Sequence, residues 1–228
     1  MSGTRPRGVE GEAEAAGWVR SMFGSVAHRY DFLNHLLSFN LDRSWRRRTV
    51  ARVEHVLARP AARVLDLCCG TGDLLGALQE KRGAPVLGCD FCRPMLSIAR
   101  RKFGGARLVE ADALRLPFAD GSLDLVTIAF GFRNLASYRA GLEEMARVLR
   151  PGGRFLVITH SEAMLEEGER FFDFRNLRRV IRGFSAENGR ALLRKHFAEV
   201  VVADYTNSLV FRSGDDGDLA QYIEFKRE

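Results

Sequence analysis

The sequence lacks long apolar runs, which excludes one class of protein at the outset. No stretch approaches the roughly 18 consecutive apolar residues that a membrane-spanning helix requires. The amino-terminal residues include glycine, glutamate and arginine and show no apolar core of a secretory signal. We therefore expect a cytoplasmic protein, and we leave open contact with the inner face of the membrane. With 228 residues, of which 46% are hydrophobic and 28% charged, the chain suits one α/β domain.

Cysteine is scarce, and the four cysteines do not have the spacing of a zinc site. Cys68 and Cys69 are adjacent, unlike the separated pairs of a zinc knuckle. Cys89 and Cys92 form a Cys-x-x-Cys pair, which is also found in redox and metal sites. All four lie near the ends of two expected strands, where small thiols can line a cleft. We favour reduced, cleft-lining cysteines over the redox and metal alternatives, and we expect no bound metal.

Signatures of nucleic-acid binding are absent, although the chain is basic. The formal net charge is +6 and the isoelectric point is about 9.5. Basic clusters occur at residues 46–48, 100–102 and 175–182. They are interpreted as solvated helix faces, with attraction to an anionic membrane surface as the alternative. Because no zinc-finger or RNA-recognition pattern accompanies them, we expect no nucleic-acid partner.

The apolar pattern predicts a doubly wound, mostly parallel α/β sheet. Residues 1–17 are expected to form a flexible amino terminus, and residues 18–58 a helical lid with a helix from Asp42 to Leu57. Strands and helices alternate over residues 59–158, which requires crossovers and helices on both faces of the sheet. Residues 159–228 are expected to add helices and an antiparallel hairpin that completes seven strands.

The individual elements follow from this pattern. Strands are expected at residues 63–67, 85–89, 106–110, 123–129, 155–158, 199–205 and 208–212. Helices are expected at residues 73–81, 94–103 and 137–149, with another capped by Ser185. The aromatic stretch with Phe171, Phe172 and Phe174 is interpreted as core more than as pocket.

A glycine turn follows the first strand in the segment VLDLCCGTGDLL, residues 64–75. Gly70, Thr71 and Gly72 lead into a helix whose N-terminus can face a ligand. A dinucleotide site would need glycine where Leu75 stands, and a phosphate-binding loop would need Gly-Lys-Ser/Thr. Asp66 and Asp73 flank the turn instead. Carboxylates there disfavour pyrophosphate and suit a ligand with an ammonium and a sulfonium, so the segment predicts S-adenosylmethionine rather than NAD.

Two further carboxylates end the next strands of the expected sheet. Asp90 stands twenty residues after Gly70 and can accept hydrogen bonds from both ribose hydroxyls, as in other doubly wound nucleotide sites. The alternative is a helix cap, since a helix begins near Pro94. Asp112 can accept from the adenine amino group while Ala113 leaves room for the ring. The alternative there is an ordinary turn aspartate.

More motifs lie on both sides of the glycine turn. They are FGSVAHRYD at 23–31, DFCRPML at 90–96, IAFGFRN at 128–134 and RVLRPGG at 147–153. With DLCCGTGDLL, they resemble class I methyltransferases and, more narrowly, the ubiquinone/menaquinone biosynthesis C-methyltransferases. The resemblance covers roughly residues 22–158. It implies a Rossmann-like enzyme that methylates a ring carbon of a demethylated, polyprenylated quinol, with S-adenosylmethionine as methyl donor.

The resemblance also implies which residues contact the cofactor, and at several positions this chain differs from the family pattern. It places Thr71, Asp90, Asp112 and Ala113 at the cofactor, and we add Ala129 at the end of the fourth strand. The family usually has His at position 42, Ser at position 129 and Glu-Phe-Ser at positions 159–161, where this chain has Asp, Ala and Thr-His-Ser. Beyond Thr159 the sequence is unlike the family.

Candidate acceptor residues come from several elements. Arg133 and Asn134 can hold a phenolate oxygen, with a loop salt bridge as the alternative for Arg133. His160, at the end of the fifth strand, is a candidate base or a packing residue. Tyr30 and Asp31 can fix the lid over the methionine moiety or tether the first helix.

Three functions therefore stay open. The first is methylation of a lipophilic quinol, and the second is methylation of another lipid or small natural product. The third is a protein of a different class, which binds S-adenosylmethionine without transferring the methyl group. A homodimer is compatible with each.

Overall fold

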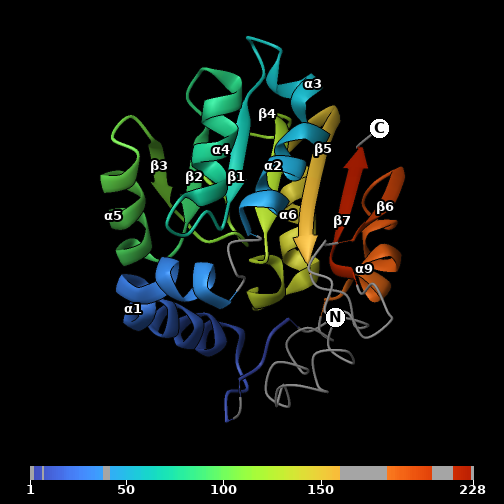
Figure 1. The fold of residues 1–228 in the computed structure, drawn as a ribbon. Helices are drawn as coiled ribbons and strands as arrows, with labels where there is room; N and C mark the ends of the chain where they lie inside the picture. Colours follow the sequence, from blue (N-terminus) through green and yellow to red (C-terminus); the bar gives the residue numbers. More distant parts are fainter. Residues whose placement is uncertain (1–2, 7, 38–41, 160–183, 207–217, 227–228) are drawn as a thin grey trace, which may run out of the picture.

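A parallel sheet with helices on both faces forms the centre of the molecule (Figure 1). The structure, a computed structural model, describes residues 3–6, 8–37, 42–159, 184–206 and 218–226. Within these residues the strands are β1 (Val64–Leu67), β2 (Leu87–Asp90), β3 (Arg107–Glu110), β4 (Leu123–Ala129), β5 (Leu149–Thr159), β6 (Glu199–Thr206) and β7 (Asp218–Lys226). Their order across the sheet is β3-β2-β1-β4-β5-β7-β6.

The first five strands run parallel, which confirms the expected parallel α/β sheet. Strand β7 runs antiparallel to both β5 and β6. Because the carboxyl ends of β1 and β4 lie at the centre, where the strand order reverses, this edge is where ligands bind in open α/β sheets.

The helices follow the sequence pattern closely in the centre of the chain. They are α1 (Glu12–Leu37), α2 (Asp42–Arg52), α3 (Glu54–Leu57), α4 (Asp73–Arg82), α5 (Arg93–Lys102), the 3₁₀ turn η1 (Phe132–Asn134), α6 (Tyr138–Val148) and α9 (Ala186–Leu193). Ser185 caps α9 as expected: its hydroxyl accepts from the Asn188 amide, and the Asn188 side chain accepts from the Ser185 amide.

Several boundaries differ from the expected ones. Helix α1 begins at Glu12 rather than Trp18, because two glutamates in its first turn suit the positive end of the helix dipole and Ala15 is buried. The expected helix from Asp42 to Leu57 is two helices, interrupted at the fully buried Val53. The strand expected at 208–212 lies outside the described residues, and β7 begins at Asp218.

Side chains on alternate strand positions build two separate cores. Leu65 and Leu67 of β1 face the cluster formed with α6 and α9. Val64 faces the opposite cluster, formed with α2, α3 and α4. Because successive strand residues point to opposite faces, Asp66 shares the face of Val64 and lies beneath α4. This alternation determines which carboxylates point toward the edge formed by the carboxyl ends of the parallel strands.

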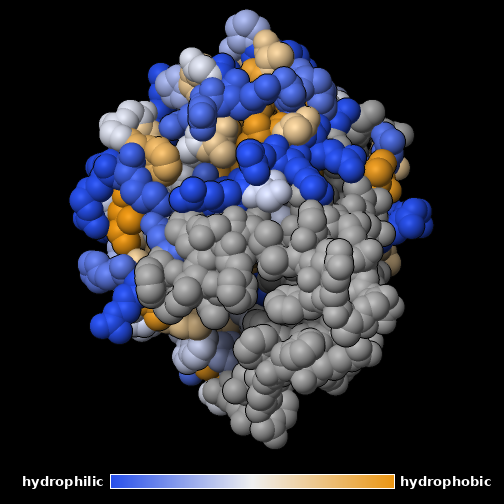
Figure 2. All heavy atoms as spheres, in the orientation of Figure 1, coloured by the Kyte–Doolittle hydropathy of each residue, from blue (hydrophilic) through white to orange (hydrophobic). Residues whose placement is uncertain are grey.

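Helix α1 lies beyond the carboxyl ends of the parallel strands and packs on α5 (Figure 1). Ala27 is buried with Met95, and Phe23 and Tyr30 are partly buried beside them. Much of the surface in Figure 2 is hydrophilic, with small apolar patches between the charged side chains. Among the described residues, no helix is long and apolar enough to cross a membrane.

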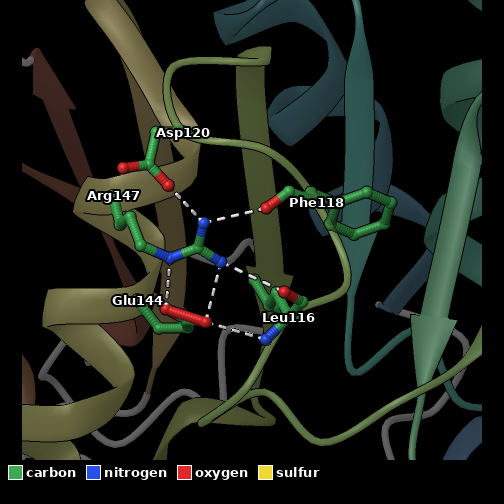
Figure 3. A network of polar contacts seen from close by, with 5 residues as sticks. All are labelled: Leu116, Phe118, Asp120, Glu144 and Arg147. Carbon is green, nitrogen blue, oxygen red and sulfur yellow. Dashed lines mark hydrogen bonds and ion pairs between the residues drawn. The ribbon is translucent and has the colours of Figure 1, made fainter.

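One arginine ties the segment after β3 to α6 (Figure 3). The Arg147 guanidinium donates to the carbonyl oxygens of Leu116 and Phe118 at 3.0 and 2.8 Å, and to Asp120 at 2.6 Å. It also makes a two-point contact with Glu144, whose carboxylate accepts from the Leu116 amide. The planar fork of arginine therefore fixes a segment that begins just after Asp112.

Replacing Arg147 with lysine tests this contact. Lysine keeps the charge but cannot donate hydrogen bonds to the carbonyls of Leu116 and Phe118 and to the Glu144 carboxylate at the same time. R147K is therefore expected to lower the free energy of unfolding by about 1 to 2 kcal/mol. The measurement is urea denaturation followed by circular dichroism. The control is R139K on the same helix, whose exposed pair with Glu143 at 3.5 Å predicts a change below about 0.5 kcal/mol. Equal effects for the two variants would contradict the role of Arg147.

Candidate active site

A cavity of about 900 Å³ lies between α1 and the carboxyl ends of the parallel strands. A cavity of this size accommodates a drug-sized ligand with space for a second, smaller group. Among the residues predicted from the sequence, those that line it are Tyr30, Gly70, Asp90, Asp112, Ala113, Ala129, Arg133 and Asn134. The structure thus brings together residues that are separated by up to about a hundred positions in the chain.

The glycine turn presents its backbone to this cavity at Gly70. Gly70 has φ +55, and a Cβ built there would meet no heavy atom within 4 Å. A side chain would therefore project into free space that a ligand can use. The Gly70 amide donates to Asp90 Oδ2 at 2.9 Å, which joins the end of β1 to the end of β2.

Two non-glycine residues adopt the left-handed conformation at the same edge. Cys68 has φ 52 and Phe130 has φ 57, each directly after its strand, and both line the cavity. Between them Gly131 approaches β1 so closely that a Cβ on it would lie 2.4 Å from Cys68 Cβ. Such conformations gather at functional sites. The sequence carries no signal for them, because neither residue type favours positive φ.

Asp90 is a buried carboxylate held by backbone amides. In addition to the Gly70 contact, its Oδ1 accepts from the Cys92 amide at 2.8 Å. Burial raises the pKa of Asp90, and the amides of Cys92 and Gly70 oppose that change. Each oxygen keeps a lone pair for a further donor, so the side chain can accept hydrogen bonds from ligand hydroxyls.

Asp112 and Ala113 form the next part of the wall. Asp112 Oδ1 accepts from the Leu114 amide at 2.9 Å and closes a short turn. Ala113 is buried and lines the cavity together with Leu114. The turn thus presents a carboxylate and an apolar surface to the same space, which suits a flat ring with an amino group.

Arg133 lines the cavity after β4, across β1 from Asp90 and Asp112 in the strand order. Its Nε and Nη1 are buried and have no hydrogen-bond partner among the described residues. Burial lowers the pKa of Arg133, while the nearby Tyr30 and Tyr138 oppose that change. A buried guanidinium without a partner is unfavourable unless a ligand supplies an acceptor. The neighbouring Asn134 amide donates weakly to the Phe130 carbonyl at 3.5 Å. The alternative for Arg133, a loop salt bridge, does not occur among the described residues.

Four predicted cofactor residues do not line the cavity: Asp66, Thr71, Gly72 and Asp73. Thr71 Oγ1 donates to Asp31 of α1 at 2.5 Å, and Asp73 forms ion pairs with Lys102 and Arg46. Asp66 faces α4 because of the strand alternation. Asp66 and Asp73 were expected beside a cationic ligand, but Asp90 and Asp112 are the carboxylates that line the cavity. His160 lies outside the described residues.

Asp66 is only 1% exposed, and the Thr127 hydroxyl donates to its Oδ1 at 2.8 Å. Burial raises the pKa of Asp66 to about 7; the Thr127 hydroxyl and the Leu75 amide oppose this, and the charge of Asp90 adds to it. A substantial share of the Asp66 side chains is therefore protonated at neutral pH, which reduces the negative charge that this residue supplies.

The cysteines occupy different environments. Cys68 lines the cavity as expected, whereas Cys89 and Cys92 are buried in the core and Cys69 is not part of the cavity wall. All four are free thiols. Burial raises the pKa of Cys89 to about 12, so this group stays protonated at neutral pH. In the part of the chain that the structure describes, no three His, Cys, Asp or Glu residues form a metal-binding group.

Sequence reasoning missed the amino-terminal part of the cavity wall. Residues 3–6 line it, and the Gly3 and Thr4 amides donate to the carbonyls of Ala136 and Leu135 at 3.2 and 2.8 Å. Arg5 donates to the Ala136 carbonyl at 2.6 Å and pairs with Glu12 at 3.4 Å. The contacts with Leu135 and Ala136 use backbone groups more than 130 positions away, for which the local sequence holds no signal.

Comparisons with known proteins find relatives among methyltransferases. The model of the ubiE/COQ5 methyltransferase family matches residues 10–177. A demethylmenaquinone methyltransferase of Thermus thermophilus is 54% identical over 142 residues, which are 60% of this chain and 63% of that protein. A ubiquinone/menaquinone biosynthesis C-methyltransferase of Geotalea daltonii is 40% identical over 151 residues, 63% of each chain.

The match to relatives is partial in length. The chain spans 58 to 63% of the length of three demethylmenaquinone methyltransferases that it matches. Among solved structures, a SAM-dependent methyltransferase of Thermotoga maritima superposes with a TM-score of 0.67 at 20% identity. The superposition covers 92% of this chain and 100% of the Thermotoga chain. A SAM-dependent methyltransferase of Aquifex aeolicus gives 0.58 at 19% identity, covering 78% and 89%. Both structures have the same α/β fold as this chain.

The raised pKa of Asp66 predicts a pH-dependent stability. Between the ordinary pKa of 3.8 and about 7, the folded protein keeps a proton that the unfolded chain has released. The contribution of this residue to the free energy of unfolding therefore falls as pH rises, by up to about 1.4 kcal/mol per pH unit in that window.

The matched variant is Asp66→Asn, which cannot titrate. We expect the free energy of unfolding of Asp66→Asn, minus that of the wild type, to increase from pH 4 to pH 7 and then to level off. Urea denaturation at each pH gives both values, and other titrating groups cancel in the difference. A difference that stays constant over this range would contradict the assignment.

Proposed function

The chain belongs to the ubiE/COQ5 methyltransferase family, and we propose that it transfers a methyl group from S-adenosylmethionine to a ring carbon of a demethylmenaquinol-like acceptor. The observation that carries the proposal is the division of one cavity into two chemically different sides. Asp90 and Asp112 follow β2 and β3 on one side, and the Arg133 guanidinium, whose Nε and Nη1 have no hydrogen-bond partner among the described residues, follows β4 on the other.

The side with the two carboxylates fits the methyl donor. Asp90 accepts from the ribose hydroxyls, while the turn at Asp112 accepts from the adenine amino group and Ala113 packs on the ring. Gly70 leaves its backbone accessible beneath the ligand. Ala129, at the end of β4, lies between the two sides. When bound, S-adenosylmethionine supplies a methyl group on a sulfonium, which makes that carbon electrophilic.

The side with Arg133 fits an acceptor that carries an aromatic hydroxyl. A desolvated guanidinium stabilises a phenolate oxygen strongly, since the surrounding cavity wall is largely apolar. Asn134 and Tyr30 line the same space and can orient the ring. Greater phenolate character raises the electron density of the ring carbon that attacks the methyl group. Loss of the ring proton then restores the aromatic ring. His160, which lies outside the described residues, stays a candidate base for that proton.

Alignment of the two reactants supplies much of the rate, because in-line displacement needs few covalent partners. We propose that α1 acts as a lid that enforces this alignment, over a sheet completed by the β6–β7 hairpin. Val19, Met22 and Phe23 of α1 line the cavity, which supports the role. Arg20 of the same helix pairs with Glu110 at the end of β3, at 2.7 Å.

A lipophilic acceptor implies access from a membrane surface. Trp18 lines the cavity and is also 48% exposed, and several arginines of α1 and α5 are exposed nearby. We propose transient contact of this face with anionic lipid, from which a prenylated acceptor would enter.

Incubation with methyl-labelled S-adenosylmethionine and an extract of demethylquinones and lipids tests the proposal. The reduced quinone fraction is expected to acquire label. Label in phospholipid or polar products alone would favour methylation of another acceptor, and binding without transfer would favour a protein that senses the cofactor.

In the same assay, R133M is expected to lower kcat/KM for the quinol by about a hundredfold, because a preorganised donor to the developing charge is lost.

The dissociation constant for S-adenosylmethionine separates two roles of Arg133. We expect it to change less than about threefold in R133M, since the acceptor side is altered and the donor side is intact. A loss of cofactor affinity as large as the loss of kcat/KM would instead assign Arg133 to the cofactor carboxylate.

Asp90→Asn tests the donor side. The amide is neutral and can accept through one atom only, so all donors to this side chain lose a charged acceptor and those that face the NH2 group lose their acceptor. The dissociation constant for S-adenosylmethionine, measured by calorimetry, is expected to rise by about tenfold to a hundredfold. The control is Asp120→Asn, at an 81% exposed side chain that does not line the cavity. Unchanged affinity in Asp90→Asn would refute the ribose role.

A further inference from the structure

Four side chains from three helices and the glycine turn meet behind the cavity. Lys102 Nζ lies 2.8 Å from Asp31 Oδ2 and also contacts Asp73. Asp31 Oδ1 accepts from Thr71 Oγ1 at 2.5 Å. Asp31 belongs to α1, Asp73 to the first turn of α4 and Lys102 to the last turn of α5. A single ammonium therefore joins α1 to the helix that follows the glycine turn.

The position of Lys102 is supported by its own helix and by its neighbours. A cation in the last turn of α5 and an anion in the first turn of α4 both suit the helix dipoles. The Lys102 ammonium also lies 5.6 Å from the centre of the Phe103 ring, which packs against Gly72 and Gly76. Lys102 is thus held beside the glycine turn by Asp73 and Phe103, and its ammonium also reaches Asp31 of α1.

Lys102 also determines how the two carboxylates coexist. Without the ammonium, Asp31 and Asp73 would present like charges to each other across α1 and α4, since both now approach the same nitrogen atom. Arg46 also contacts Asp73, at 3.4 Å. The side chains of Lys102, Asp31 and Asp73 are only 29, 29 and 24% exposed, so solvent screens their charges less than those of surface pairs.

The bond between Asp31 and Thr71 connects this cluster to the cavity. Thr71 follows Gly70, whose backbone lines the cavity, and Asp31 follows Tyr30, which lines it from α1. Lys102 itself does not line the cavity. Any influence it has on a ligand therefore passes through the relative position of α1 and the turn.

We propose that Lys102 is a positioning residue that couples α1 to the glycine turn and thereby slows the release of bound S-adenosylmethionine. The identity of the ligand rests on the proposed function, whereas the coupling of α1 to the turn does not. Lys102 holds Asp31 in the orientation in which it accepts from Thr71, and this keeps Tyr30 against the cavity.

The first measurement is ligand release from three variants. Stopped-flow dissociation of S-adenosylmethionine is expected to be about five- to twentyfold faster in K102M than in the wild type, with a smaller change in the association rate. K102R keeps the charge and is expected to stay within about threefold. The control is K81M on α4. The Lys81 ammonium pairs with Glu54 at 2.5 Å, and neither residue lines the cavity, so the release rate of K81M is expected to match that of the wild type.

A double-mutant cycle tests the route through Asp31. If Lys102 acts through Asp31, then adding K102M to Asp31→Asn is expected to accelerate release by less than about twofold beyond Asp31→Asn alone. Independent, multiplicative effects of the two substitutions would overturn the proposal, as would a release rate in K102M equal to that of K81M.

Amide hydrogen exchange of the unliganded protein separates this inference from the proposed function. In K102M, amides of residues 19–31 are expected to exchange at least about fivefold faster, while those of α6 keep their wild-type rates. If the wild type fails to bind S-adenosylmethionine, the proposed function fails, and the exchange data still decide the coupling. Unchanged exchange in α1, or equal acceleration in α1 and α6, would overturn the role of Lys102.

Discussion

The hydrogen bond from the Gly70 amide to the Asp90 carboxylate is the contact on which the rest of the site depends. It joins the ends of two neighbouring parallel strands and shapes the turn between β1 and α4. A carboxylate in that place must be buried, which is unfavourable, and the amides of Gly70 and Cys92 compensate for the lost water. The remaining lone pairs of Asp90 then face the cavity, ready for ligand hydroxyls.

Charge is distributed unevenly around the same cavity, and this distribution supports a two-substrate reaction. Carboxylates occupy the side formed by β2 and β3, and a guanidinium without a hydrogen-bond partner at two of its nitrogens occupies the side after β4. The strained residues Cys68 and Phe130 lie between them, at the ends of the two central strands. Preorganised groups of opposite charge on two sides of one space allow two different molecules to be aligned.

The parallel sheet, Asp90 and Asp112 could be predicted from the sequence, because strand and helix periodicity places these residues at one edge. Asp66 could not be assigned correctly from its distance to the glycines alone. Its orientation follows from the two-residue period of β1, which directs it beneath α4 toward Thr127. The start of α1 and the contacts of residues 3–6 depend on partners far away in the chain, which local patterns do not encode.

A calorimetric titration of the purified protein with S-adenosylmethionine and, separately, with NAD tests the central claim most directly. We predict saturable 1:1 binding of S-adenosylmethionine and no measurable heat with NAD, because Leu75 stands where a dinucleotide site needs glycine. Saturable binding of NAD, with no binding of S-adenosylmethionine, would contradict it.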